Sequence, residues 1–139
     1  MQLMNQRTGA TVASVVEIAA TRATRRKGLL GRASFDPSAA LILSPCVAVH
    51  TAFMRFAIDV AFVSRDGVVR RMVSLPPWRM AADFGACAVV EFAAGAARDV
   101  RVGDRIYLSD GSSVPGAGIT SFSCPSLRST ASNPACSGS

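Results

Sequence analysis

The sequence has little charge, few aromatic residues and no long apolar run. Only 17% of its 139 residues are Asp, Glu, Lys or Arg, and 50% are hydrophobic, so the chain is not a disordered polyelectrolyte and can bury a core. No stretch approaches the roughly 18 consecutive apolar residues that a membrane-spanning helix needs. The N-terminus also lacks the pattern of a signal peptide. We therefore expect one folded domain in the cytoplasm.

Histidine occurs once, as His50, and none of the four cysteines belongs to a C-x-x-C pair. These absences exclude zinc-finger and thioredoxin-type sites, and we expect no cofactor. Cys46 and Cys87 lie among apolar residues, where a reduced cysteine behaves as a small hydrophobic side chain, so we expect them to be core thiols. Cys124 and Cys136 could form a bridge only in an oxidising compartment.

The positive charge is concentrated near the N-terminus. The chain has 15 basic residues against 9 acidic ones, a net charge of +6, and residues 1–32 alone contribute +5. Such a cluster could meet a phosphate or an acidic partner. Every basic residue except Lys27 is Arg, however, which also fits a compositional bias. We therefore do not expect nucleic acid as the partner.

The composition changes at Ser109, after which Ser, Gly, Pro and Thr dominate. Such a segment has too few large apolar residues to offset the entropy lost on ordering. We therefore expect a disordered tail over residues 109–139, although Ile119, Phe122 and Leu127 could dock on the domain. The folded domain is expected over residues 10–108.

Most apolar runs within the domain are short and rich in β-branched residues, as in strands. Asp66-Gly67 lies between two such runs and predicts a hairpin, because glycine tolerates the positive φ of tight hairpin turns. Thr21 can cap a short helix from Arg22 to Leu30, closed by Gly31. Many short strands with one short helix predict a mainly β sandwich or barrel. The predicted strands lie within residues 11–20, 41–43, 47–50, 58–63, 68–73, 87–92 and 102–108.

Two acidic residues, Asp59 and Glu91, interrupt apolar strands and could face one cleft. A buried carboxylate is costly unless it is paired or accepts several hydrogen bonds, so an inward-facing Asp59 needs a partner. Arg25, Arg55 and Arg79 are the candidates. Asp59 is then either a base, a metal ligand or a ligand-binding group, or else a structural ion-pair partner or an outward-facing residue.

His50 and Thr51 precede Asp59 closely in the sequence. A hydroxyl nucleophile, a histidine base and an acidic residue that orients it form the usual set for covalent catalysis. There is no G-x-S-x-G motif, so Thr51 is the only nearby nucleophile. A single histidine is also commonly a hydrogen-bonded structural residue.

Trp78 follows two prolines and precedes Arg79, so it lies on a stiff loop. An exposed Trp on such a loop can present a flat apolar surface to a ligand or a partner. The same side chain could equally cover an open end of the sandwich. Both interpretations remain open.

Four blocks of the sequence occur in a recognisable order: ATRRKGLLGR (23–32), VHTAFMRFAIDVAFV (49–63) followed by DGV, VEFAAG (90–95) and VGD (102–104). They resemble the DUF192 family, also called UPF0127 or COG1430. Its pattern is roughly R-x-x-G-L-M-G-R, I-P-L-D-x-x-F-x-x-x-D-G-x-V, E-L-x-x-G and G-D. The resemblance covers about residues 16–107, with Leu30 and Ala57 in place of the usual Met and Pro.

The resemblance implies a compact, mainly β domain of jelly-roll-like type with a short helix near its start. It brings no assigned biochemical role. The polar residues that match the family blocks are Arg25, His50, Thr51, Asp59, Glu91 and Asp104.

We therefore expect a small module that binds a small molecule or a protein. One alternative is a hydrolase-like or metal-dependent enzyme that uses His50 and Asp59, with Glu91 as a further oxygen ligand. Another is a structural or partner-binding domain that acts through Trp78 and the basic residues 1–32. The expected ligand-binding residues are His50, Thr51, Arg55, Asp59, Trp78, Arg79 and Glu91.

Overall fold

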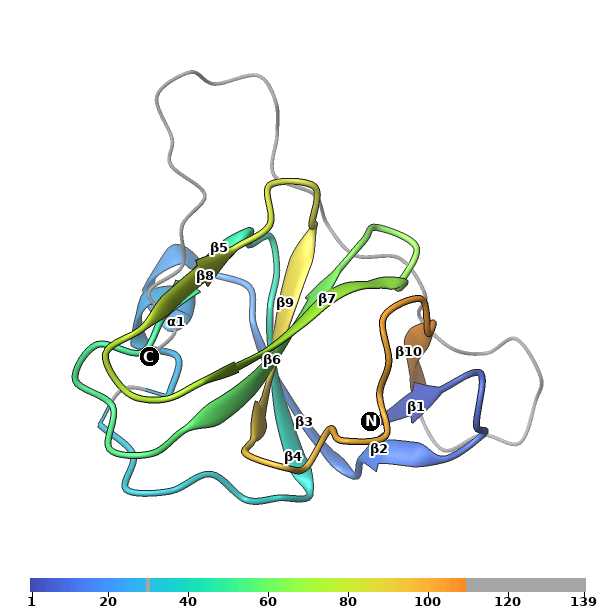
Figure 1. Cartoon of the computed structure of the whole chain (residues 1–139), viewed down its shortest axis with the longest axis horizontal. Coiled ribbons are helices and arrows are strands. Elements are labelled where there is room, and N and C mark those ends of the chain that lie inside the picture. Colours follow the sequence, from blue (N-terminus) through green and yellow to red (C-terminus); the bar gives the residue numbers. More distant parts are fainter. Residues whose placement is uncertain (30, 110–139) are drawn as a thin grey trace.

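The computed structural model describes residues 1–29 and 31–109, and these form a mainly β domain with one short helix, as predicted (Figure 1). Apart from Ser109, the expected tail lies outside the described residues. The elements are β1 (Gln2–Asn5), β2 (Thr11–Ala13), β3 (Val15–Ala19), α1 (Arg22–Lys27), β4 (Ala39–Leu43), β5 (Ala48–His50), β6 (Ile58–Val63), β7 (Val69–Leu75), β8 (Met80–Ala82), β9 (Ala88–Ala93) and β10 (Ile106–Ser109).

The strands form three open sheets in the described part of the chain. The largest has the order β3-β4-β9-β6-β7, the second β10-β1-β2, and the third pairs β5 with β8. All these pairs are antiparallel except β3 and β4, which run parallel. Because no sheet closes, the barrel expectation is wrong, and these strand orders do not show a jelly roll.

The five-stranded sheet has a hydrophobic core on each face, which explains why its central strands are apolar except for Asp59 and Glu91. Strands β4, β6 and β9 are buried along their whole length. Side chains alternate between the two faces of a strand. In β6, Val60 and Phe62 point to one core, here called the first core, and Ala61 and Val63 point to the opposite one, the second core.

Different elements cover the two cores. The first core is closed by Leu29 and Phe35, which follow α1, and by Val49 and Ala81 from the β5–β8 pair. The second core is closed by the three-stranded sheet, with Leu3, Ala13, Ile106 and Leu108. Figure 1 accordingly shows β5 and β8 at one side of the molecule and β1 and β10 at the other.

Helix α1 is shorter than predicted. Thr21 caps it, and the side chains of Thr21 and Thr24 each accept a hydrogen bond from the other residue's backbone N–H. The helix ends at Gly28, whose φ is 42°, and not at Gly31 as expected. Glycine adopts positive φ without a Cβ clash, so the first glycine after the cap ends the helix.

No helix in the described residues is long and apolar enough to cross a membrane.

The predicted hairpin is confirmed, and two other strands are additions to the sequence prediction. Gly67, with φ 86°, lies in the turn between β6 and β7, and its N–H donates to the carbonyl of Ser64 at 3.0 Å. Strand β1 lies before the range expected for the domain, and β8 follows directly on the loop around Trp78. Both are short, and the Met-Ala-Ala sequence of β8 has little intrinsic preference for a strand.

The buried cysteines differ from the expectation of reduced core thiols. Cys46 and Cys87 are buried as predicted, and the N–H of Cys46 donates to the carbonyl of Cys87 at 3.1 Å. Both are disulfide-bonded, however, and no described cysteine is a free thiol. Apolar neighbours in the sequence indicated burial correctly but carried no information on oxidation.

Candidate functional site

Asp59 and Glu91 lie on opposite faces of the five-stranded sheet. In the register of β6 and β9, Asp59 is opposite Phe92, which belongs to the second core, and Glu91 is opposite Val60, which belongs to the first core. Residues directly opposite each other in neighbouring strands share a face. The two carboxylates therefore do not meet in one cleft.

Asp59 is fastened at the edge of the second core. One carboxylate oxygen accepts a hydrogen bond from the Ser74 hydroxyl at 2.8 Å, and the other accepts one from the Gly95 N–H at 2.9 Å. These partners replace the candidate arginines. The side chain ties β6 to β7 and to the turn after β9, which is a structural role.

Glu91 is fully buried on the first-core face, near a surface ion pair. Glu17 of β3 lies in the same row of the sheet, two strands away. Arg32 forms a bidentate pair with Glu17 at 2.9 and 3.1 Å. The hydrogen bond from Arg32 lowers the pKa of Glu17, and the pKa of Arg32 is raised by Glu17 and, more weakly, by Glu91. This pair fastens the segment after α1 to the edge strand.

Thr51 joins two loops that follow β5 and β7, residues 51–57 and 76–79, here called the tip loops. Its hydroxyl donates to the carbonyl of Pro76 at 2.6 Å and accepts from the N–H of Arg79 at 2.8 Å. Its own N–H donates to the carbonyl of Arg79 at 2.7 Å, and its carbonyl accepts from the N–H of Trp78 at 2.9 Å. The side chain is completely buried, so Thr51 holds the loops together and its hydroxyl proton is engaged.

The tip loops present two exposed aromatic rings, Phe53 and Trp78, here called the aromatic pair. The ring centroids are 4.6 Å apart and the planes are inclined by 58°. The side chains are 70% and 59% exposed. Among the described residues other than glycine, these are the two with positive φ, 66° for Phe53 and 65° for Trp78. That backbone conformation is strained for a bulky residue.

Further polar and apolar side chains lie in the tip loops or directly next to them in the chain. Met80 is the first residue of β8, is 73% exposed and lies directly opposite His50 of β5. Val49, the neighbour of His50, points to the first core, so His50 lies on the outer face of this two-stranded sheet. Arg55 and Arg79 are exposed on the tip loops.

Five of the seven expected site residues therefore lie in or next to the tip loops, and two lie elsewhere. His50, Thr51, Arg55, Trp78 and Arg79 form the group at the tip. Asp59 and Glu91 are buried apart from it and from each other. No three His, Cys, Asp or Glu side chains in residues 1–29 and 31–109 are close enough to hold a metal ion.

Sequence reasoning missed Phe53 and Met80, the other apolar members of this surface. Phe53 is separated from Trp78 by 25 positions, and the two rings meet because the β5–β8 pairing and the Thr51 hydrogen bonds bring the loops together. No local pattern marks Phe53 as a residue with positive φ. The exposed Met80 could have been found only if β8 had been predicted, because strand alternation then places it on the face opposite Ala81.

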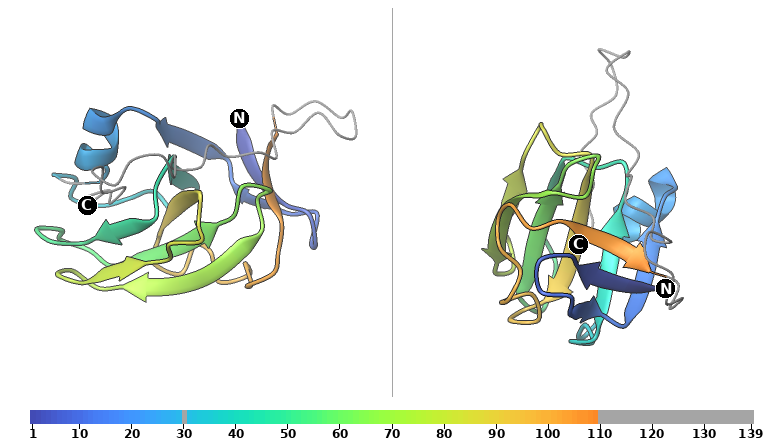
Figure 2. Two further views of the ribbon diagram at one scale, coloured as in Figure 1. Left: turned by 90° about the horizontal axis from the view of Figure 1, so that it is seen from above. Right: turned by 90° about the vertical axis from the view of Figure 1, so that its right-hand side faces the viewer.

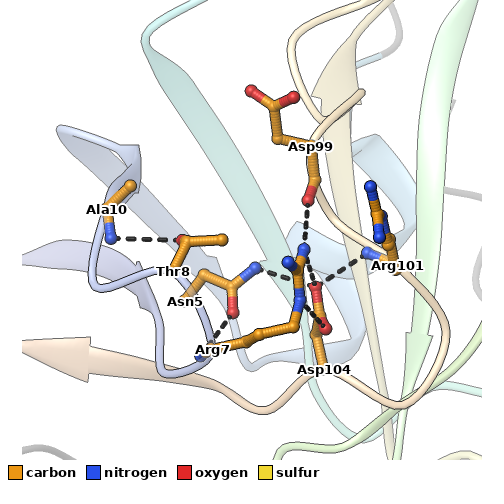
Figure 3. Close-up of polar contacts among 7 residues, drawn as sticks. All are labelled: Asn5, Arg7, Thr8, Ala10, Asp99, Arg101 and Asp104. Carbon is orange, nitrogen blue, oxygen red and sulfur yellow. Dashed lines mark hydrogen bonds and ion pairs between the residues drawn. The ribbon is translucent and has the colours of Figure 1, made fainter.

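A polar network joins the segment that follows β1 to the segment that precedes β10 (Figure 3). Arg7 forms a bidentate pair with Asp104 at 2.6 and 3.1 Å, and Asp104 also accepts hydrogen bonds from the Asn5 side chain and the Arg101 N–H, both at 2.9 Å. These donors hold the pKa of Asp104 well below its usual range, with the Arg7 hydrogen bond as the largest cause. A hollow of about 440 Å³ beside the network is lined by Gln6, Arg7, Val68, Gly103, Asp104 and Arg105.

Comparison with protein families matches residues 3–108 to a single model, DUF192, described as "Uncharacterized ACR, COG1430". The chain belongs to the DUF192 family. This match covers all the elements described above except the first residue of β1 and the last of β10. No curated protein matches this DUF192 chain.

Two crystal structures have a similar fold. One, from Sinorhizobium meliloti 1021, is described as a "putative transcription regulator", and the other, from Novosphingobium aromaticivorans DSM 12444, as a protein of unknown function. Each is 22% identical to this DUF192 chain, with a TM-score of 0.65 over 76% of it. The matches cover 88% and 83% of the respective structures. At this identity the likeness concerns the fold alone.

Proposed function

We propose that this DUF192 domain is a small binding module whose recognition surface is the aromatic pair with Met80, His50, Arg55 and Arg79. One observation carries the proposal: the strained backbone positions and the exposed aromatic rings are the same two residues. Strain in a folded chain persists only where the surrounding structure enforces it, and it gathers at functional sites.

The strain is enforced by Thr51. Hydrogen bonds between its hydroxyl, N–H and carbonyl groups and residues 76–79 fix both loops before any ligand arrives. A surface that is already ordered loses less conformational entropy on binding. Large aromatic side chains that are fixed in water have no evident role in folding, and they provide contact area for a partner.

A hydrolase-like enzyme has less support. The hydroxyl of Thr51 donates to a backbone carbonyl, so it is not poised toward a base. Asp59 faces the second core and accepts from Ser74 and Gly95, whereas His50 lies on the outside of the layer that closes the first core. Asp59 is therefore not placed to orient this imidazole.

Trp78 is the only tryptophan of the chain, so its fluorescence reports directly on the proposed surface. The test is a screen of peptides, oligonucleotides, small organic anions and lipid vesicles for ligands that change this emission. We expect at least one ligand class to do so with the wild type and with Phe84→Gly, but not with Phe53→Gly. Phe84 is a matched control because it is 81% exposed and lies outside the tip loops. If no class changes the emission, or if Phe53→Gly responds like the wild type, the surface is not the binding site.

A further inference from the structure

We propose that the tip loops bind the surface of an anionic lipid bilayer, with the aromatic pair and Met80 entering the interface and Arg55 and Arg79 meeting the lipid phosphates. This inference rests on the proposed function and names the partner of that same surface. Three observations support it: the exposed apolar area, the local charge and the position of the loops on the molecule.

The apolar part is large for a surface that faces water. Phe53, Trp78 and Met80 are 70%, 59% and 73% exposed, and all three come from the tip loops or the residue that follows them. Single exposed apolar residues are ordinary, but three of them in these loops, two with aromatic rings in tilted contact, indicate an interaction site. Tryptophan in particular favours the boundary between water and lipid, where the ring meets the acyl chains and the indole N–H stays hydrated.

The charge around these side chains has one sign. Residues 45–58 and 75–82 contain Arg55 and Arg79 but no Asp or Glu. The nearest acids along the chain are engaged elsewhere: Asp59 accepts from Ser74 and Gly95, and Asp83 is paired with Arg70 at 3.0 Å. The surface therefore complements an anionic partner, and basic residues close to a bilayer are attracted by its negative surface potential.

The position of the loops fits a flat partner. Seen from above, the green loop 51–57 and the yellow-green loop 76–79 project together beyond the strands at one end of the molecule, away from β1 and β10 (Figure 2). A small ligand is usually held in a concave pocket. Projecting loops with more than half of each apolar side chain exposed offer no such enclosure, whereas a bilayer needs only a protruding apolar tip.

The test measures binding of the full chain to vesicles by co-sedimentation and by the emission of Trp78. The probes are vesicles of phosphatidylcholine alone and of phosphatidylcholine with an equal part of phosphatidylglycerol. We expect binding and a blue shift of Trp78 with the anionic vesicles, and weakening of both in high salt. Phe53→Gly and Met80→Gln should each reduce the affinity by about tenfold, the loss expected for one buried apolar side chain.

Charge reversal provides a matched pair of variants. Arg55→Glu should abolish the preference for anionic vesicles. Arg65→Glu makes the same change in net charge in the β6–β7 turn, at the opposite end of these strands, and should bind like the wild type. Equal losses with both variants would show that only the net charge matters and would overturn the proposal.

Other outcomes separate this inference from the proposed function. If vesicles fail to bind but an acidic peptide, an oligonucleotide or soluble glycerol phosphate shifts Trp78 in a Phe53-dependent way, the lipid inference falls and the binding module stands. If Trp78 emission is blue-shifted before vesicles are added and does not respond to them, a second copy or another part of the chain already covers the pair, and the inference is wrong. If no probe acts through Phe53, both proposals fall.

Discussion

The two ends of the domain differ in how far their charged or aromatic side chains are engaged by other groups of the chain. At the end formed by β1 and β10, the charged groups of Arg7 and Asp104 are paired, and Asp104 receives two further hydrogen bonds. At the tip loops, two large aromatic rings face water from a strained backbone. Both ends contain residues of kinds that bind ligands.

The difference indicates which end acts on other molecules. The Asp104 carboxylate already accepts hydrogen bonds from several donors of the chain. A ligand would have to displace these donors, which hold the N-terminal strand. The aromatic pair has most of its surface unused, and forming it costs conformational strain. A satisfied network stabilises the fold, whereas an unsatisfied, strained surface is maintained for a contact that the isolated chain lacks.

The largest effect on stability is expected from Thr51→Val, which keeps the shape of the side chain and removes the hydroxyl. The N–H of Arg79 and the carbonyl of Pro76 would each lose a buried partner. We expect a loss of about 2–4 kcal/mol in the free energy of unfolding, measured by chemical denaturation. The aromatic pair should also loosen, which a change in Trp78 emission would detect.

Thr11→Val is the control for this variant. Thr11 is exposed on β2, and its hydroxyl donates a hydrogen bond to the sulfur of Met4. Its replacement should change stability by no more than about 0.5 kcal/mol. If Thr51→Val lowers the free energy of unfolding by as little as Thr11→Val, this hydroxyl does not hold the tip loops together. The aromatic pair would then not be a rigid surface, and the proposed difference between the two ends would fail.

A smaller loss is expected at the opposite end from Asp104→Asn, and it should depend on pH. Arg7 would lose its ionic partner, which should lower the free energy of unfolding at neutral pH by less than Thr51→Val does, because the Arg7 side chain is partly exposed to water. Because the pKa of Asp104 is lower in the folded protein than in the unfolded chain, its contribution is complete above the unfolded pKa of about 4. The contribution is lost as the pH falls below that value.

The stability difference between the wild type and Asp104→Asn should therefore shrink on acidification below about pH 4. Thermal unfolding at several pH values measures it. Asp66→Asn, in the exposed β6–β7 turn, serves as the control, and its stability should change with pH in the same way as that of the wild type. A difference that stays constant or grows toward low pH would mean that the network does not hold the Asp104 carboxylate in its charged form.

Much of the fold could be predicted because its signals are local. The β-branched runs gave most strands, the Asp66-Gly67 pair gave the hairpin, and the threonine cap gave the start of the helix. The end of the helix was placed three residues too late because two glycines compete for it. Strands β1 and β8 are held by pairing with distant partners, β10 and β5, which no local pattern reveals.

The site was predictable only in part for the same reason. Trp78, Arg79 and the segment around His50 were found because their residue types are unusual. The separation of Asp59 from Glu91 depends on sheet register, and a shift of one residue would reverse the face of either side chain. Phe53 has no sequence signal, because its exposure depends on a backbone angle that the Thr51 contacts impose across 25 or more positions.

The smallest expected effect is the most direct test of strain at the tip. Phe53 has a φ of 66°, while Phe84, similarly exposed, does not share this conformation. Phe53→Gly should be more stable than Phe53→Ala by about 1 kcal/mol, since alanine keeps the Cβ that disfavours positive φ. Phe84→Gly should be less stable than Phe84→Ala by about 0.5–1 kcal/mol. Neither glycine nor alanine has the aromatic ring, so denaturation curves of the two variants at each position compare the backbone alone. If glycine were the less stable variant at both positions, Phe53 would not be strained, and strain would no longer distinguish the two ends of the domain.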